Sequence, residues 1–270
     1  MATPTVHLHC YFEGQIAGSL TASDYFAYLR GSVDPTTPEQ ASLPPKDRFA
    51  DAGVNLDFRT NQVGGVIAFQ HSLRDPDSVV IYLGHSALDF DRHYSLGLTP
   101  RGLWYAEMTD MDRWNNFDSR RREKHTGEKP LPPEDLMSAL KKSAAKLVIL
   151  ASCGSATIPN GLSLANFNAQ GAAAWKGKVA GGPAVVVTYS TLLTTWSNNW
   201  AWALAHFLFD LIDYEVDLTH DKTGRTITRK AEHDGSIQTA LDAANAAFKN
   251  YKAPDTFVLV NGTGSTVVFP

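Results

Sequence analysis

Short apolar segments recur along the chain and predict its β-strands. Six of them stand out: TVHLHCYF (5–12), VNLDFR (54–59), SVVIYLGH (78–85), KLVILASC (146–153), AVVVTYS (184–190) and TFVLVN (256–261). Most are rich in valine, isoleucine and leucine and lack alternating polar residues, which is typical of strands covered on both faces. We therefore expect a mainly parallel sheet that is buried between helices.

Between these segments, apolar residues recur at spacings of three and four, which indicates amphipathic helices. The expected helices are 21–30, 60–73, 132–145, 195–212 and 236–251. Thr60, the sequence PPED (132–135) and Ser197 carry helix-start signals for three of them. The alternation of strands and helices predicts an α/β sandwich with a mainly parallel central sheet.

The remaining stretches predict connections. FVLVNGTGSTVVF, near the end of the chain, predicts an edge hairpin that turns at Gly262 and Gly264. Residues 33–53 are proline-rich and polar and residues 117–131 are highly charged, so we expect both to be exposed loops. No internal repeat or low-complexity tract divides the chain, and we expect one domain over residues 1–270.

Composition and charge narrow the possible functions. The net charge of −4 and the pI near 6.1 lack the basic surplus of nucleic-acid-binding proteins, so we set that class aside. No window approaches the roughly 18 apolar residues of a membrane span, and the first residues do not resemble a secretory signal. Only Cys10 and Cys153 are present, which is too few for a disulfide framework. We therefore expect a cytoplasmic protein that does not bind membranes.

Two consecutive expected strands end in reactive side chains. SVVIYLGH ends at His85 and KLVILASC ends at Cys153. Parallel neighbouring strands bring their carboxyl ends to one edge of the sheet, where functional groups collect. A cysteine nucleophile needs a nearby base to form its thiolate, and histidine is the usual one. The sequence therefore predicts a His85 and Cys153 dyad, with the backbone amides of Ser86 and Cys153 as an oxyanion hole.

VVIYLGHSA and KLVILASCGSA resemble the paired His and Cys blocks of the caspase-like cysteine peptidases, most closely those of the CHAT and separase type. Three further segments agree with that family. SLGLTPRGLWYAEM (95–108) lies where the family has a hairpin after the histidine, residues 130–150 resemble the helix that leads into the cysteine strand, and residues 184–212 resemble the following strand and long helix. The resemblance covers roughly residues 54–270.

The resemblance implies a three-layer caspase-like sandwich and a cysteine endopeptidase. His85 would be the general base and Cys153 the nucleophile that carries the acyl-enzyme intermediate. The family often builds part of its S1 pocket from the residues after the fifth strand, here Tyr189, Ser190 and Thr191. The substrate would be a peptide or protein, and no cofactor or metal is implied. Many members of the family are regulated by a protein partner or by self-cleavage, and if this chain is cut in that way, residues 117–131 are the expected place.

The sequence departs from the family at two positions. Ser86 follows the histidine, where peptidases of this family usually have glycine. Ala151 stands two residues before the cysteine, where metacaspases carry an acidic residue that binds basic P1 side chains. The resemblance therefore implies no P1 specificity.

The sequence offers two other enzyme classes as alternatives to the dyad. GHSAL could begin a serine nucleophile elbow at Ser86, served by Asp210 or Asp213 with His220 or His233, although Leu88 replaces the glycine of that motif. His7 and His9 share one face of the first expected strand, as metal ligands do, but further ligand motifs are missing and a structural role is favoured.

An interaction module without catalysis is the alternative from another class. A silent caspase-like domain could bind a partner through the basic loop at 117–131 or the helix that carries Trp196, Trp200 and Trp202. NGTGST (261–266) follows an expected strand but precedes another strand, so it does not match a phosphate-binding loop.

Overall fold

The computed structural model describes a set of segments that together contain the central sheet and its covering helices. They are residues 3–11, 15–16, 20–30, 47–60, 65–84, 86–88, 94–99, 102–105, 136–152, 155, 172–188, 198–212, 214–217, 226–229, 236–250 and 257–262.

A six-stranded sheet forms the centre of the described structure. Its strand order is β13-β10-β9-β5-β1-β4, and every neighbouring pair is parallel except β10 and β13, which are antiparallel. The strands are β1 (Thr5–Tyr11), β4 (Asn55–Thr60), β5 (Val79–Gly84), β9 (Leu147–Ala151), β10 (Ala184–Thr188) and β13 (Phe257–Asn261). Each falls within one or two residues of an expected strand, and the prediction of a mainly parallel sheet is confirmed.

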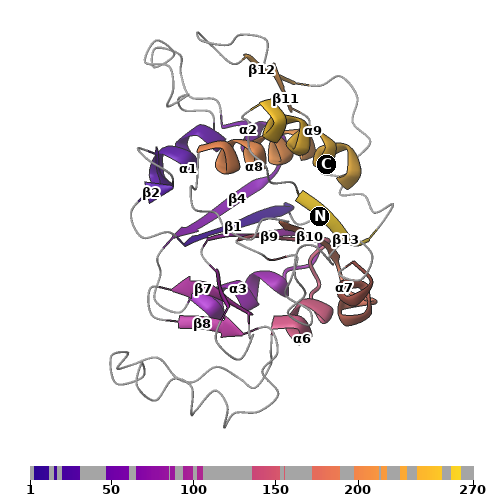
Figure 1. Ribbon diagram of the computed structural model, residues 1–270. Coiled ribbons are helices and arrows are strands. Elements are labelled where there is room, and N and C mark those ends of the chain that lie inside the picture. Colours follow the sequence, from indigo (N-terminus) through magenta and orange to yellow (C-terminus); the bar gives the residue numbers. More distant parts are fainter. Residues whose placement is uncertain are drawn as a thin grey trace.

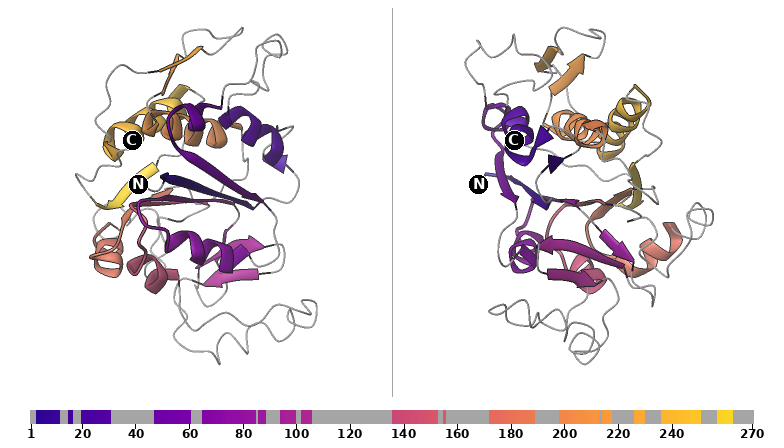
Figure 2. Two further views of the ribbon diagram at one scale, coloured as in Figure 1. Left: turned by 180° about the vertical axis from the view of Figure 1, so that it is seen from behind. Right: turned by 60° about the vertical axis from the view of Figure 1, so that its left-hand side comes forward.

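Helices cover both faces of this sheet, as Figure 1 and the two further views in Figure 2 show. One face carries α1 (Ala22–Arg30), α2 (Arg48–Asp51), α8 (Asn198–Leu211) and α9 (Ile237–Asn250). The other face carries α3 (Gly65–Leu73), α6 (Leu136–Lys141) and α7 (Ala172–Val179). The fold is therefore an α/β sandwich, as the alternation of elements predicts.

Side chains of the central strands alternate between two hydrophobic cores. On β5, Val79, Ile81 and Leu83 pack toward α1, α8 and α9, whereas Val80 and Tyr82 pack toward α3, α6 and α7. All of β5, β9 and β10 is buried. The continuous apolar runs in the sequence follow from this burial, because neither face of these strands meets water.

Smaller antiparallel sheets accompany the central one. β6 (Ser86–Leu88), β7 (Tyr94–Thr99) and β8 (Gly102–Tyr105) form a three-stranded sheet directly after β5, and β7 with β8 confirms the expected hairpin. β2 (Gln15–Ile16) pairs with β3 (Leu20–Thr21), and β11 (Tyr214–Asp217) pairs with β12 (Thr226–Arg229).

Three expectations about the elements were wrong. Thr60 does not start a helix, because it continues the ladder with β1 opposite Cys10, and α3 begins only at Gly65. The stretch 33–53 is not all loop, because α2 forms there with Asp47 as its N-cap and Phe49 buried. No helix was expected at α7, where Trp175 and Val179 are buried one turn apart.

Several predicted features lie outside the described residues. These are the charged stretch 117–131, most of the stretch 33–53, PPED, Ser197 and the second strand of the terminal hairpin. Its first strand is described as β13, an edge strand of the central sheet. Among the helices that the structure describes, none has the length and apolarity needed to cross a bilayer.

Candidate active site

The two strands that lead to the predicted dyad are neighbours at the centre of the sheet. β5 and β9 are parallel and in register from Val79 opposite Leu147 to Leu83 opposite Ala151. His85 and Cys153 follow these strands and lie outside the described residues. The expected adjacency of the two strands is confirmed, and the dyad itself stays a prediction.

Buried hydroxyl groups hold the residues on the two sides of Cys153 in place. Ser152, Ser155 and Thr188 are each fully buried. The Ser155 hydroxyl lies 2.7 Å from the carbonyl oxygen of Leu150 and accepts the amide proton of Thr188 at 2.7 Å. The Thr188 hydroxyl donates to the carbonyl oxygen of Ser152 at 2.5 Å. These bonds attach Ser152 and Ser155 to Thr188 at the end of β10.

Backbone hydrogen bonds also link the residues around Cys153. The amide of Ser152 donates to Leu150 O at 3.0 Å, and the amide of Ser155 donates to Ser152 O at 3.3 Å. The sequence alone did not predict this network. A hydroxyl residue on each side of a strand-end cysteine was the available signal, but it is too common in turns to be decisive.

Ser86 begins a strand. It is the first residue of β6 and lies opposite Leu96 of β7 in the antiparallel ladder. A serine nucleophile elbow requires a sharp turn from a strand directly into a helix. The alternative of a serine hydrolase at Ser86 therefore lacks its structural context. Of its proposed partners, Asp210 is buried on α8, and Asp213, His220 and His233 lie outside the described residues.

Cys10 is fully buried in the core between the sheet and the helices α1, α8 and α9. Burial raises the pKa of its thiol far above the ordinary value. A thiol in such a site stays protonated and out of reach of solvent, so it cannot act as a nucleophile. Any cysteine chemistry of this chain therefore belongs to Cys153.

The two histidines of β1 share one face of the strand, as expected. This face is the one covered by α3, and both side chains form bonds on it. His7 lies between two carboxylates, with Nδ1 2.8 Å from Asp57 and Nε2 2.7 Å from Asp75. His9 is fully buried, and its Nε2 lies 2.9 Å from the hydroxyl of Ser72. Within the described segments, no His, Cys, Asp or Glu side chains are grouped so that they could hold a metal ion. The contacts of both histidines are structural.

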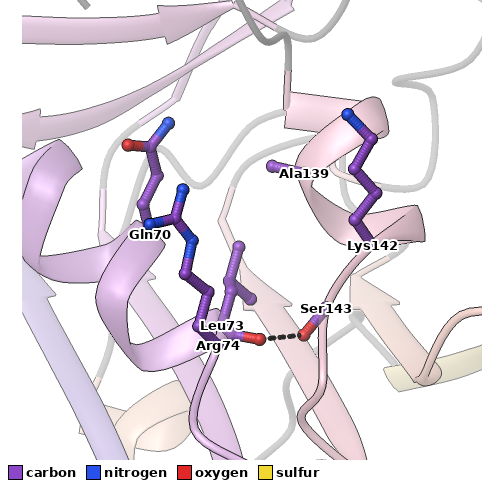
Figure 3. A pocket seen from close by; sticks show the side chains of 6 residues that line it. All are labelled: Gln70, Leu73, Arg74, Ala139, Lys142 and Ser143. Carbon is purple, nitrogen blue, oxygen red and sulfur yellow. Dashed lines mark hydrogen bonds between the residues drawn. The ribbon is translucent and has the colours of Figure 1, made fainter. Parts of the chain in front are cut away.

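A surface cavity of about 250 Å³ lies between α3 and α6 (Figure 3). Its lining includes Gln70, Arg74 and Lys142. The segments that follow these helices bond to each other where β5 and β9 begin, for example Lys146 N to Ser78 O at 2.9 Å. The cavity is therefore at the amino edge of the sheet, opposite the predicted dyad. Cations at helix C-termini complement the helix dipole, so Arg74 and Lys142 need no ligand to explain them.

The structure does not describe the side chains of the other predicted contact residues. Residues 189–191, the expected S1 residues, come directly after Thr188. Trp196 is likewise outside the described residues, and Trp200 and Trp202 belong to α8, with side chains that the structure does not describe.

No model of a known protein family matches this chain, and no curated protein is similar to it.

Proposed function

We propose that the chain is a cysteine endopeptidase with a caspase-like fold, in which His85 is the general base and Cys153 the nucleophile. The observation that carries this proposal is the register of β5 with β9. Leu83 lies opposite Ala151, and the histidine and the cysteine each follow this pair by two residues. Neighbouring strands are about 4.8 Å apart, a spacing that favours contact between an imidazole and a thiol.

The order of strands in the sheet also supports a site at this edge. From β1, the chain first adds β4 on one side and then β5, β9 and β10 on the other. Ligands of open α/β sheets bind at the carboxyl edge, next to the point where the strand order reverses. β5, which precedes His85, is one of the two strands at that point.

The order of the elements supports the caspase-like fold. A small antiparallel sheet, β6 to β8, follows the histidine strand, and α6 precedes the cysteine strand. The long helix α8 follows β10. Each of these elements is one that the family resemblance implies at that place in the chain.

In the proposed reaction, His85 takes the proton of the Cys153 thiol, and the thiolate attacks the carbonyl carbon of the scissile bond. The backbone amides of Cys153 and Ser86 stabilise the oxyanion. The C–N bond then breaks as His85 protonates the leaving amine. Water attacks the thioester with His85 as base, the C–S bond breaks, and the peptide acid leaves. Residues 189–191 would contact the P1 side chain.

The test is cleavage of a fluorogenic peptide library by the purified protein. Because a nucleophile and its base act as a unit, Cys153→Ala and His85→Ala should each lower kcat/KM by about 1000-fold or more. Cys10→Ala makes the same chemical change at a buried cysteine and should leave the turnover of folded protein unchanged. Full activity in Cys153→Ala would contradict the proposal.

The same experiment separates the enzyme from a silent interaction module. An electrophilic peptide, such as a chloromethyl ketone, should form a covalent adduct at Cys153 of the wild-type protein, detected by mass spectrometry. A wild-type protein that cleaves no library member and forms no adduct would favour the silent module.

A further inference from the structure

We infer that Ser155 and Thr188 are positioning residues for Cys153, and that their hydroxyl groups form a latch between the residues that flank Cys153 and the end of β10. This inference rests on the proposed function of Cys153. The latch is defined here as the side chains of Ser155 and Thr188 with the carbonyl groups of Leu150 and Ser152 that they bind.

One assignment of protons satisfies the three shortest contacts of the latch. Each hydroxyl has a single proton to donate. The proton of Ser155 goes to Leu150 O at 2.7 Å, and the proton of Thr188 goes to Ser152 O. The oxygen of Ser155 accepts the Thr188 amide at 2.7 Å, and the two hydroxyl oxygens lie 3.0 Å apart. Two side chains therefore bind three backbone groups.

The latch replaces strand pairing where that pairing ends. β9 and β10 are in register up to Leu150 opposite Val187. Beyond this pair, the chain after Ala151 leaves the sheet, and the hydroxyl groups keep it attached to the neighbouring strand. Because Ser152, Ser155 and Thr188 are all fully buried, water does not compete for these bonds.

The position of the latch along the chain gives it a functional consequence. Only Cys153 and Gly154 lie between the anchored residues Ser152 and Ser155. Thr188, the other end of the latch, directly precedes the predicted substrate-contact residues 189–191. The latch therefore connects the residues that flank the predicted nucleophile to Thr188, the residue before the predicted substrate-contact segment. A misplacement of about 1 Å at such a site can lower the rate by about 100-fold.

The test compares closely matched hydroxyl variants. Thr188→Val keeps the shape of the side chain and removes its hydroxyl, and Thr188→Ser restores the hydroxyl. Ser155→Ala removes the other hydroxyl. Ser143→Ala is the control, because Ser143 donates a similar bond of 2.8 Å to Leu73 O at the opposite edge of the sheet.

The measured quantity is the rate of alkylation of Cys153 by iodoacetamide from pH 5 to pH 9, on protein shown to be folded by circular dichroism. We expect Thr188→Val and Ser155→Ala to raise the apparent pKa of the thiol by about one unit, and so to lower the rate at neutral pH about tenfold. Thr188→Ser and Ser143→Ala should keep the wild-type pH profile, even where they lower Tm. A purely structural latch would change Tm alone.

Two results would overturn the inference, and they are distinguishable. If Thr188→Val and Ser155→Ala both keep the wild-type pH profile, the latch does not position Cys153, and the proposed peptidase stands without it. If wild-type Cys153 itself reacts as an ordinary thiol and His85→Ala changes nothing, the proposed function is wrong, and the inference falls with it.

Discussion

At the scale of residues, His7 and His9 differ in surroundings although they are neighbours on one face of β1. His7 lies between Asp57 and Asp75, and its hydrogen bond is the main reason that the pKa of Asp57 is lowered to about 2. His9 is fully buried, and burial, assisted by the positive charge of Arg59, lowers its pKa to about 3. His9 therefore remains neutral in the folded protein near neutral pH.

His9 should make stability fall in mild acid. Its pKa in the folded protein is below the ordinary value of 6.5, so the unfolded chain binds the proton first. Above pH 6.5, His9 is neutral in both states and the free energy of unfolding does not depend on it. As the pH falls from 6.5 toward 3, the free energy of unfolding decreases by about 1.4 kcal/mol per pH unit. In urea unfolding, the drop in stability from pH 7 to pH 5 should be about 2 kcal/mol smaller in His9→Gln than in the wild type.

Titration of Asp57 does not contribute to the difference between pH 7 and pH 5. Its carboxyl is almost fully charged over this range in both the folded and the unfolded chain. An equal drop in stability in the wild type and in His9→Gln would show that His9 does not titrate on unfolding.

The sequence predicts some of the candidate site and misses the rest for a physical reason. His85 and Cys153 stand out because each ends a long apolar run, which marks the end of a buried strand. Ser155 and Thr188 do not stand out, because their role depends on which strand lies beside β9. Only the pairing of β9 with β10 brings these two residues together.

At the scale of elements, α7 shows what the hydrophobic pattern omits. The helix is eight residues long, and its sequence AAAWKGKV has little contrast between its faces. Trp175 is nevertheless fully buried in the core shared with β9, β10 and α6. Trp175, with the smaller Val179 one turn later, holds this helix to the sheet.

Loss of this side chain should be costly. Trp175→Ala should lower the free energy of unfolding by about 3–5 kcal/mol, because it leaves a cavity in a packed core. The exposed neighbour Lys176→Ala is the control and should change stability by less than about 0.5 kcal/mol. Urea unfolding followed by circular dichroism measures both. A loss below about 1 kcal/mol in Trp175→Ala would mean that α7 is not held in this way.

Elements that are buried on both faces are the ones that the sequence predicts best. The strands β5, β9 and β10 are buried along their whole length and were all expected, because such apolar runs have no counterpart in loops. Short elements such as α2 depend on a single cap and a single buried residue, here Asp47 and Phe49. The end of β4 was misplaced because a threonine serves equally well in a strand and as a helix cap.

At the scale of the whole molecule, the sheet order decides which residues can act together. The apolar pattern gives the strands but not their neighbours, since β1, β5 and β9 all read as buried parallel strands. The pairing of β5 with β9 brings together the two segments that lead to His85 and Cys153. With Cys10 enclosed in the core, one cysteine remains for catalysis. The proposed peptidase activity therefore depends on contact between His85 and Cys153.

The measurement that tests this contact most directly is the rate of alkylation of Cys153 by iodoacetamide at pH 7, in the wild type and in His85→Ala. An adjacent imidazole stabilises the thiolate, so the wild type should react at least about ten times faster than the variant. His71→Ala, a change at an exposed histidine of α3, should match the wild type. Equal rates in the wild type and His85→Ala would contradict the dyad.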